Sequence, residues 1–314
     1  MMHKSAKYKP IFWTVLFTLC LFLSGCSANE TTLNVTAPSQ YEDITQTNSS
    51  SCEIMVMDVN QGLSVLFETD GKYVLYDGGG RETSAYLVSK LNDMGIQCID
   101  YMIVSHYDED HIAGLIGVLN TTSVNNVICP DYETDTKIYQ SFISAINKSG
   151  ANIIHPQLGD VFEESEMTMT VISADYISSE ENDCSIAILF SIGEKSIIIS
   201  GDCSAKKEAD IIADFENIDC DILVAAHHGS RYSNSEMFLN KTTPDYVIIS
   251  CGENNEYGHP HQEVLDRVSN YNAAVYRTDL QGNITIEIEG NDVNVEAKDI
   301  ADTVYETETT ENVR

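Results

Sequence analysis

The feature of this sequence that most restricts its fold is the run HYDEDH at residues 106–111, which holds two histidines and two aspartates within six positions. A strand-like apolar stretch at residues 99–104 precedes the run, and small apolar residues follow it. This order is typical of a turn from a buried strand into a helix. Imidazole binds borderline cations such as zinc and carboxylate oxygen binds harder ones, so the run predicts a site for one or two divalent ions. An acidic, solvated loop is the alternative.

Six of the eight histidines fall in three short clusters, and the run above holds the first pair. The other clusters are HHGS at residues 227–230 and HPH at residues 259–261, and each follows an apolar run. A fourth apolar run ends in Gly201-Asp202, where glycine permits a tight turn at a strand end. We expect these strand ends to meet at one edge of a sheet. Ordinary turns are the alternative for the Gly-Asp pair and for the HPH segment.

The order of these motifs resembles the metallo-β-lactamase fold, and within it the hydrolase domain of ComEC-type competence proteins. Further matches are MDVNQG at residues 57–62, DGG at 77–79, DCSIAIL at 183–189 and YRTD at 276–279. The similarity covers roughly residues 52–290, a length suited to one large α/β domain. It implies a four-layer αβ/βα sandwich with two divalent metal ions at one edge.

The resemblance also implies a set of metal ligands. These carry over as His106, Asp108, Asp110, His111, Asp202 as a bridging carboxylate, and one of His227 and His228. The family more often has histidine in place of Asp108, and a further family histidine is missing near Asn182 and Asp183. The first metal site is therefore richer in oxygen, which leaves zinc and manganese as open alternatives.

The chemistry expected from such a site is attack by water. Two cations lower the pKa of a shared water and neutralise charge on a phosphoryl or carbonyl oxygen, so no protein nucleophile is required. We expect Asp110 to be essential for catalysis, and His259 or His261 to protonate the leaving group. Ser230 and Arg231 are the expected substrate-binding residues, with Arg231 as a phosphate clamp unless it is simply an exposed charge.

The N-terminus predicts export. Three lysines and the apolar residues 11–23 precede Ser24-Gly25-Cys26, which is the order of a secretory signal peptide with a site resembling a bacterial lipobox. Cleavage before Cys26 would leave a lipidated cysteine that anchors the protein to the outer face of the cell membrane. An uncleaved membrane anchor is the alternative. The expected organisation is a signal peptide (1–25), a flexible tether (26–51), a hydrolase domain (52–292) and an acidic disordered tail (293–314).

Local patterns predict several elements of the domain. Strands are expected near residues 53–58, 64–69, 73–76, 101–105, 186–191 and 196–200, and helices near 83–94, 136–149, 205–215 and 261–269. Seven cysteines remain beyond the lipobox. An odd number without a CxxC pair argues against a regular disulfide framework or a structural zinc ribbon.

Charge limits the partners of the chain. Without the signal peptide, 14 Lys and Arg residues stand against 49 Asp and Glu residues, a formal charge of −35. Such a body repels polyanions, so DNA is a possible but disfavoured substrate. The first hypothesis is a membrane-tethered extracytoplasmic metal-dependent hydrolase of small or polymeric phosphoesters, such as a phosphodiesterase or nuclease. Alternatives are hydrolysis of a cell-wall phosphorylcholine ester, a lactone or a β-lactam, or a non-enzymatic binding protein; the sequence leaves the oligomeric state open.

Overall fold

The computed structural model describes residues 51–178 and 180–297. The chain divides into two units, residues 1–46 and 47–314, and all described residues belong to the second. The expected signal peptide, the lipidation site at Cys26, nearly all of the tether and most of the acidic tail lie outside the described residues.

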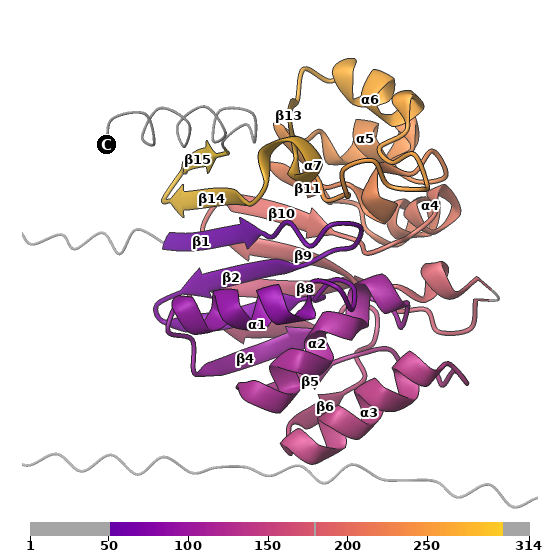
Figure 1. Ribbon diagram of the computed structural model, residues 1–314. Helices are drawn as coiled ribbons and strands as arrows, with labels where there is room; N and C mark the ends of the chain where they lie inside the picture. The colour runs from indigo at the N-terminus through magenta and orange to yellow at the C-terminus, as the bar shows by residue number, and fades with distance from the viewer. Residues whose placement is uncertain (1–50, 179, 298–314) are drawn as a thin grey trace, which may run out of the picture. The chain divides into compact units, whose positions relative to one another are not determined.

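One sheet contains eight strands in the order β15-β14-β1-β2-β3-β4-β5-β6 (Figure 1). Their bounds are β1 (Ser51–Val56), β2 (Val65–Thr69), β3 (Lys72–Tyr76), β4 (Cys98–Ile103), β5 (Ser123–Ile128), β6 (Asn152–Ile154), β14 (Ile284–Glu289) and β15 (Asp292–Glu296). Strands β3 to β6 are parallel and the other pairs are antiparallel. The carboxyl ends of β3 and β4 therefore lie at the same edge.

A second sheet contains seven strands in the order β13-β12-β11-β10-β9-β8-β7. Their bounds are β7 (Val161–Glu164), β8 (Met167–Ser173), β9 (Ala187–Ile192), β10 (Lys195–Ile199), β11 (Ile222–Val224), β12 (Tyr246–Ile249) and β13 (Ala274–Arg277). Strands β10 to β13 are parallel. Their carboxyl ends also share one edge, as expected for the strands that precede the second and third histidine clusters.

Helices cover the outer face of each sheet. The first sheet carries α1 (Ser84–Asp93), α2 (Glu109–Thr121) and α3 (Lys137–Ser149). The second carries α4 (Ala205–Asp214), α5 (Glu236–Thr242) and α6 (Gln262–Ser269). The short helix α7 (Thr278–Gln281) and the 3-10 turns η1 (Glu181–Cys184) and η2 (Ala226–Gly229) complete the described elements. The expected four-layer αβ/βα sandwich is confirmed.

Three hydrophobic cores hold these layers together. The inner faces of both sheets form the central core, where the rings of Phe67 and Phe190 stack with centroids 4.3 Å apart. Each outer core joins one sheet to its helices, for example through Leu115 of α2 and Phe238 of α5. Strands with both faces buried are nearly continuous apolar runs, and this explains why β10 and β12 were recognisable from sequence.

Two glycines bring the polar segments close together. A Cβ atom on Gly114 of α2 would lie 1.8 Å from the carbonyl oxygen of Gly78, so α2 packs directly on the turn after β3. Gly201, after β10, has φ of +53° and a Cβ there would lie 2.6 Å from Cβ of Ser105. A side chain at either position would push the segments apart. These contacts fix the ends of β3, β4 and β10 against one another.

The domain extends past the end expected from sequence. Strand β14 alternates buried isoleucines with polar residues, and Val293 and Val295 of β15 pack on the same core. Residues 293–297 therefore belong to the domain rather than to the acidic tail, and β1 already begins at Ser51. The polar and acidic residues between the apolar positions concealed this alternation. No helix among the described residues has the length and hydropathy needed to cross a membrane.

Candidate metal centre

The predicted ligands converge where the strand ends of both sheets meet. His106 lies between β4 and α2, His111 lies in the first turn of α2, Asp202 lies between β10 and α4, and His228 lies in η2 after β11. Their side chains are almost entirely buried. The fold therefore brings these residues together from distant parts of the sequence, as the sequence analysis predicts.

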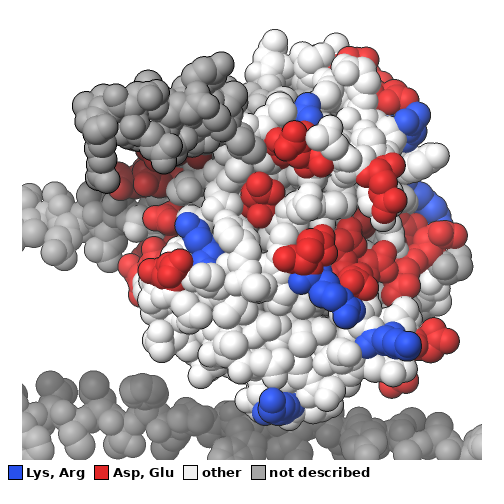
Figure 2. Space-filling view, in the orientation of Figure 1, with Lys and Arg blue, Asp and Glu red and all other residues white. Residues whose placement is uncertain are grey.

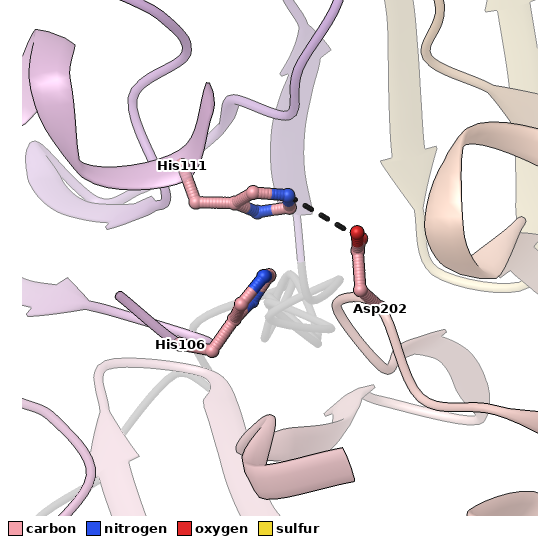
Figure 3. A group of neighbouring side chains, drawn as sticks. All are labelled: His106, His111 and Asp202. Carbon is pink, nitrogen blue, oxygen red and sulfur yellow. Dashed lines mark ion pairs between the residues drawn. The ribbon is translucent and has the colours of Figure 1, made fainter. Parts of the chain in front are cut away.

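His106, His111 and Asp202 form one group of donors, with ligand atoms within 4.8 Å of one another. In Figure 3, the ring of His111 points at the carboxylate of Asp202, and the ring of His106 lies beside both. His111 Nε2 is 3.3 Å from Asp202 Oδ1. On the solvent side, Asp108 Oδ2 is 3.5 Å from His106 Nε2.

Asp110, His111 and His228 form a second group of donors within 4.8 Å of one another. Asp110 Oδ2 is 3.4 Å from His228 Nε2, and Asp110 Oδ1 is 3.9 Å from His111 Nε2. Asp202 Oδ1 also faces this group, at 3.7 Å from His228 Nε2. Asp202 therefore faces both groups, as expected of a bridging carboxylate.

The donor atoms fit divalent ions. Among the described residues, several buried polar atoms have no hydrogen-bond partner, including His106 Nε2, His111 Nε2, His228 Nε2 and Asp202 Oδ1. Such atoms are costly in a folded protein unless something binds them. Their separations resemble those of atoms on one tetrahedral zinc ion, which lie roughly 3.4 Å apart for bonds of about 2.1 Å. The arrangement is that of a metal site rather than of a hydrogen-bond network.

Charge within the centre is balanced between carboxylates and imidazoles. Burial opposes ionisation of Asp202, but the imidazoles of His111 and His228 outweigh it and hold its pKa well below the ordinary value. Burial likewise opposes protonation of His111 and His228, but the facing carboxylates, chiefly Asp202, raise the pKa of both. The pKa of Asp110 is lowered because His111 and His228 outweigh its burial. Ionised carboxylates and protonated imidazoles therefore favour each other in this centre.

Asp77, which the sequence analysis did not assign to the site, orients the first pair of histidines. Its side chain is fully buried after β3, and its carboxylate accepts hydrogen bonds from Ser105 N at 2.8 Å and Ser105 Oγ at 2.7 Å. The same carboxylate lies 2.7 Å from His111 Nδ1, which leaves Nε2 facing the donor groups. Ser105 Oγ is also 3.0 Å from His106 Nδ1. The DGG motif at residues 77–79 was the signal that could have identified this role.

Both histidines of the HHGS motif reach the centre. His228 Nδ1 lies 3.0 Å from the carbonyl oxygen of Ser250, so this nitrogen donates and Nε2 is free to face Asp110. His227 Nε2 lies 3.6 Å from Asp202 Oδ2, and the His227 side chain is partly exposed. Of this pair, only His228 belongs to a donor group among the described residues.

The HPH segment lies next to the donors, but His259 is not suited to the expected role of protonating the leaving group. The ring of His259 is 5.6 Å from that of His227 and 6.2 Å from that of His228. Burial and the neighbouring imidazoles lower the pKa of His259 to about 4, so its ring is neutral near pH 7 and is a poor proton donor to a leaving group. His261 lies farther out, and its Nδ1 accepts a hydrogen bond from Arg231 N.

The expected substrate-binding residues are already engaged. Ser230 is buried, and its Oγ accepts a hydrogen bond from Tyr232 N. The Arg231 guanidinium forms an ion pair of 2.8 Å with Glu263 of α6. A free phosphate clamp at Arg231 is therefore not present, because the sequence distance to Glu263 concealed a partner that the fold brings close.

A sandwich of this kind, with two His and Asp donor groups at one edge, defines the class of metal-binding proteins built on the metallo-β-lactamase fold. A sequence profile described as the Metallo-beta-lactamase superfamily matches residues 57–253. The chain therefore belongs to that superfamily. Family membership and the donor set together support the expected class of a metal-dependent hydrolase.

The chain is also similar to competence proteins. ComE operon protein 3 of Bacillus subtilis is 29% identical over 255 residues, which are 75% of this chain and 33% of that protein. Competence protein ComA of Neisseria gonorrhoeae is 28% identical over 237 residues, which are 73% of this chain and 31% of that protein. The chain spans about a third of the length of these relatives. The resemblance to ComEC-type proteins is confirmed.

Comparison with solved structures supports the fold. The metallo-beta-lactamase fold protein YhfI from Bacillus subtilis aligns with a TM-score of 0.52 at 14% identity. The alignment covers 79% of this chain and 100% of YhfI. At this identity the likeness concerns the fold alone.

The Asp77 contacts predict a loss of metal affinity without loss of folding. In Asp77→Asn, the hydrogen bond that orients His111 Nε2 is weakened, so we expect the affinity for Zn²⁺ or Mn²⁺ to fall roughly 10- to 100-fold. Isothermal titration calorimetry measures this affinity. Asp221→Asn is a matched control, because Asp221 also accepts a backbone N–H, from Ser196, but at the opposite end of β11. Equal affinities for all three proteins would contradict the assigned role.

The raised pKa values of His111 and His228 predict that metal binding releases protons. Both imidazoles hold protons above their ordinary pKa of 6.5, whereas a bound ion requires neutral imidazole. We therefore expect the apparent affinity to rise as the pH increases from about 6 to about 8. Calorimetric titrations at pH 7 in buffers of different ionisation enthalpy should give heats that depend on the buffer. Heats independent of the buffer would show that no proton leaves.

Proposed function

We propose that this chain hydrolyses phosphoester bonds with the help of two divalent ions, and that it does so outside the cytoplasm. The observation that carries the proposal is the shared carboxylate of Asp202, which faces one donor group around His106 and another around Asp110 and His228. Zinc and manganese are both compatible with this mixed set of nitrogen and oxygen donors.

The reaction we propose uses water as the nucleophile. When bound, paired divalent ions make water nucleophilic near neutral pH and neutralise charge that builds on a phosphoryl oxygen. The protein supplies donors held at fixed positions by Asp77, Ser105 and the carbonyl of Ser250. His259, neutral at pH 7, supplies a hydrogen bond to a bound phosphate rather than a proton.

Among the described residues, the cysteine and the two serines that adjoin or contact the donors are poorly suited to act as the nucleophile. Cys203 follows Asp202 directly, but its thiol is fully buried and burial raises its pKa well above the ordinary value. Ser185 Oγ accepts a hydrogen bond from Asp202 N, and Ser105 Oγ is engaged by Asp77. A thiolate or activated hydroxyl would need a base and an exposed position. These contacts favour direct attack by water.

The charges around the site favour a small substrate over a long polyanion. Arginines near its rim are each paired with a carboxylate: Arg231 with Glu263, Arg81 with Glu109 and Arg277 with Asp279. On the face drawn in Figure 2, acidic side chains outnumber basic ones. A competence protein is among the relatives, which supports DNA as the polymeric alternative. Gripping a nucleic acid would then require a basic partner.

A phosphorylcholine ester is a second candidate substrate, and Tyr257 favours it. Tyr257 is 57% exposed, and its ring stacks on that of His259 with centroids 5.7 Å apart. Burial and the negative charge of the nearby Asp110, Glu256 and Asp108 carboxylates raise the pKa of its phenol. An exposed aromatic face among carboxylates binds quaternary ammonium groups well.

A set of chromogenic substrates tests this function. We expect hydrolysis of bis-p-nitrophenyl phosphate or p-nitrophenyl phosphorylcholine with Mn²⁺ or Zn²⁺, and no hydrolysis of a chromogenic β-lactam. Asp110→Ala should reduce the rate to that of buffer, because it removes a donor shared with His228. Asp93→Ala, an exposed carboxylate at the end of α1, is the control and should retain the full rate. An Asp110→Ala enzyme as active as the control would rule out the metal mechanism.

We further propose that the chain is a lipoprotein anchored through Cys26 on the outer face of a bacterial membrane. The support is the sequence pattern that precedes this cysteine. A bacterium expressing the full chain should incorporate a radioactive fatty acid into it, and Cys26→Ala should abolish both the label and recovery in the membrane fraction. Labelling that persists in Cys26→Ala would refute the assignment.

A further inference from the structure

A cavity of about 390 Å³ is lined by Asp131 and by the segments 155–158 and 174–177, which follow the carboxyl ends of β5, β6 and β8. Strands β4, β5 and β6 are parallel, and β8 runs parallel to β10 because each is antiparallel to β9. The carboxyl ends of β4 and β10 precede His106 and Asp202. The cavity and the metal centre therefore share one edge of the sandwich.

The cavity begins close to the metal centre. Neighbouring strands of a sheet lie roughly 4.8 Å apart, so Asp131 after β5 is about one strand spacing from His106 after β4, and His155 after β6 is about two. A phosphoester held at the centre has its ester alcohol within a few bonds of the phosphorus. The alcohol part of a substrate can therefore reach the cavity.

Tyr132 connects the cavity to the metal centre. It follows Asp131, and its hydroxyl accepts a hydrogen bond of 3.2 Å from Tyr107 N, the residue that separates the first two candidate ligands. The same hydroxyl donates to Glu181 Oε1 at 3.3 Å, which joins the end of the first sheet to the loop before β9. These contacts hold the wall of the cavity in a fixed position relative to the metal ligands.

The polar groups that remain free in the cavity are mainly hydrogen-bond acceptors. The exposed carboxylate of Asp131 has no hydrogen-bond or ion-pair partner among the described residues. His155 Nδ1 lies 3.0 Å from the carbonyl oxygen of Cys129, so in the neutral ring this nitrogen donates and Nε2 is left as an acceptor. The hydroxyl of Tyr176 is already used, because it donates to Pro156 O at 2.8 Å. A ligand must therefore bring hydrogen-bond donors.

The charge of the lining excludes an anionic ligand. No lysine or arginine lines the cavity. The ammonium group of Lys207, which lines an adjoining cavity beside α4, is bound by Asp175 at 2.9 Å and by Asp210 at 3.5 Å. A second phosphate group, such as the next one along a nucleic acid, would face carboxylates without a cation to bind it. The ligand is therefore uncharged or cationic.

Hydroxyl groups match this lining better than a quaternary ammonium does. A hydroxyl both donates and accepts, so it can donate to Asp131 or to His155 Nε2 and accept from the side-chain amide of Gln157. A quaternary ammonium has no hydrogen to donate. Leu158 and Ile177, which are 48% and 93% exposed, provide apolar surface for the C–H groups of such an alcohol.

We propose that this cavity binds the alcohol part of a phosphodiester substrate, and that this alcohol is a polyol or a monosaccharide. The inference rests on the proposed hydrolysis of phosphoesters and names its substrate class. A volume of about 390 Å³ lies near the lower end of the roughly 300–1,000 Å³ typical of small-molecule sites, so the cavity suits one polyol unit rather than several.

Binding of a free polyol tests the site without an activity assay. We would load the full-length chain in detergent with Zn²⁺ and measure saturation transfer from the protein to ribitol by NMR. Asp131→Ala should weaken the binding of ribitol roughly tenfold, since it removes hydrogen bonds to a charged acceptor. Asp135→Ala is the matched control, because Asp135 is an exposed carboxylate of the same segment that does not line the cavity.

Two chromogenic diesters test the substrate class. The p-nitrophenyl phosphodiesters of ribitol and of ethanol release the same phenol and differ only in the second alcohol. We expect kcat/KM with Mn²⁺ to be roughly tenfold higher for the ribitol ester, chiefly through a lower KM. In Asp131→Ala the ratio of the two values should fall to about one, whereas Asp135→Ala should keep the ratio of the wild type.

The possible outcomes are distinct. Equal kcat/KM for the two esters in the wild type, or ribitol binding that Asp131→Ala leaves unchanged, would overturn the cavity assignment while leaving the proposed function intact. Tetramethylammonium that binds more tightly than ribitol, and does so through Asp131, would overturn the polyol class. Hydrolysis of neither ester would overturn the proposed function even if ribitol binds. A ribitol preference that is lost together with ribitol binding in Asp131→Ala would support both.

Discussion

The centre of this molecule depends on one buried charge, the carboxylate of Asp202, which is 4% exposed between the two sheets. An ionised carboxylate in such a place is unfavourable unless opposite charge faces it. His111, in the first turn of α2, and His228, after β11, face this carboxylate, and its charge favours their protonated form and raises the pKa of both. The same side chains become neutral ligands when ions replace the protons. The arrangement is therefore electrostatically balanced in both conditions.

Each half of the centre is held by a fully buried acidic side chain that accepts backbone N–H groups. Asp77 accepts Ser105 N beside the first pair of histidines, and Glu208 accepts Asn234 N beside the HHGS turn. These contacts satisfy main-chain donors that would otherwise be unpaired. They leave the imidazoles with few accessible orientations, so the inner donors are rigid. The more exposed carboxylates of Asp108 and Asp110 and the ring of Tyr257 lie on the solvent side.

The positions of most donor residues could be predicted from the sequence. A strand with both faces buried is a continuous apolar run, so polar residues at its end are easy to recognise. That signal placed Asp202, His106 and the HHGS motif just beyond strand ends, whereas the HPH segment leads into α6 rather than following β12 directly. It could not place Glu263 next to Arg231, since packing of α6 decides that contact. It also could not give the left-handed turn after β11, which depends on Asn234 and Arg267. The strand β5 and the acidic hairpin β14–β15 were missed for a related reason, because polar residues interrupt their apolar positions and no continuous apolar run results.

The donors come from two stretches of chain that belong to opposite sheets, and Asp202 follows His111 by 91 residues. When the polypeptide emerges from a ribosome or from a translocation pore, the first stretch is therefore exposed long before the second stretch has folded. Neither stretch alone has the full donor set that discriminates between cations, so the ion that occupies it is the one that is plentiful. Selectivity between metal ions therefore arises only after the second sheet has folded and packed against the first. The ion content of the mature molecule will reflect the supply in the place where its synthesis and folding are completed.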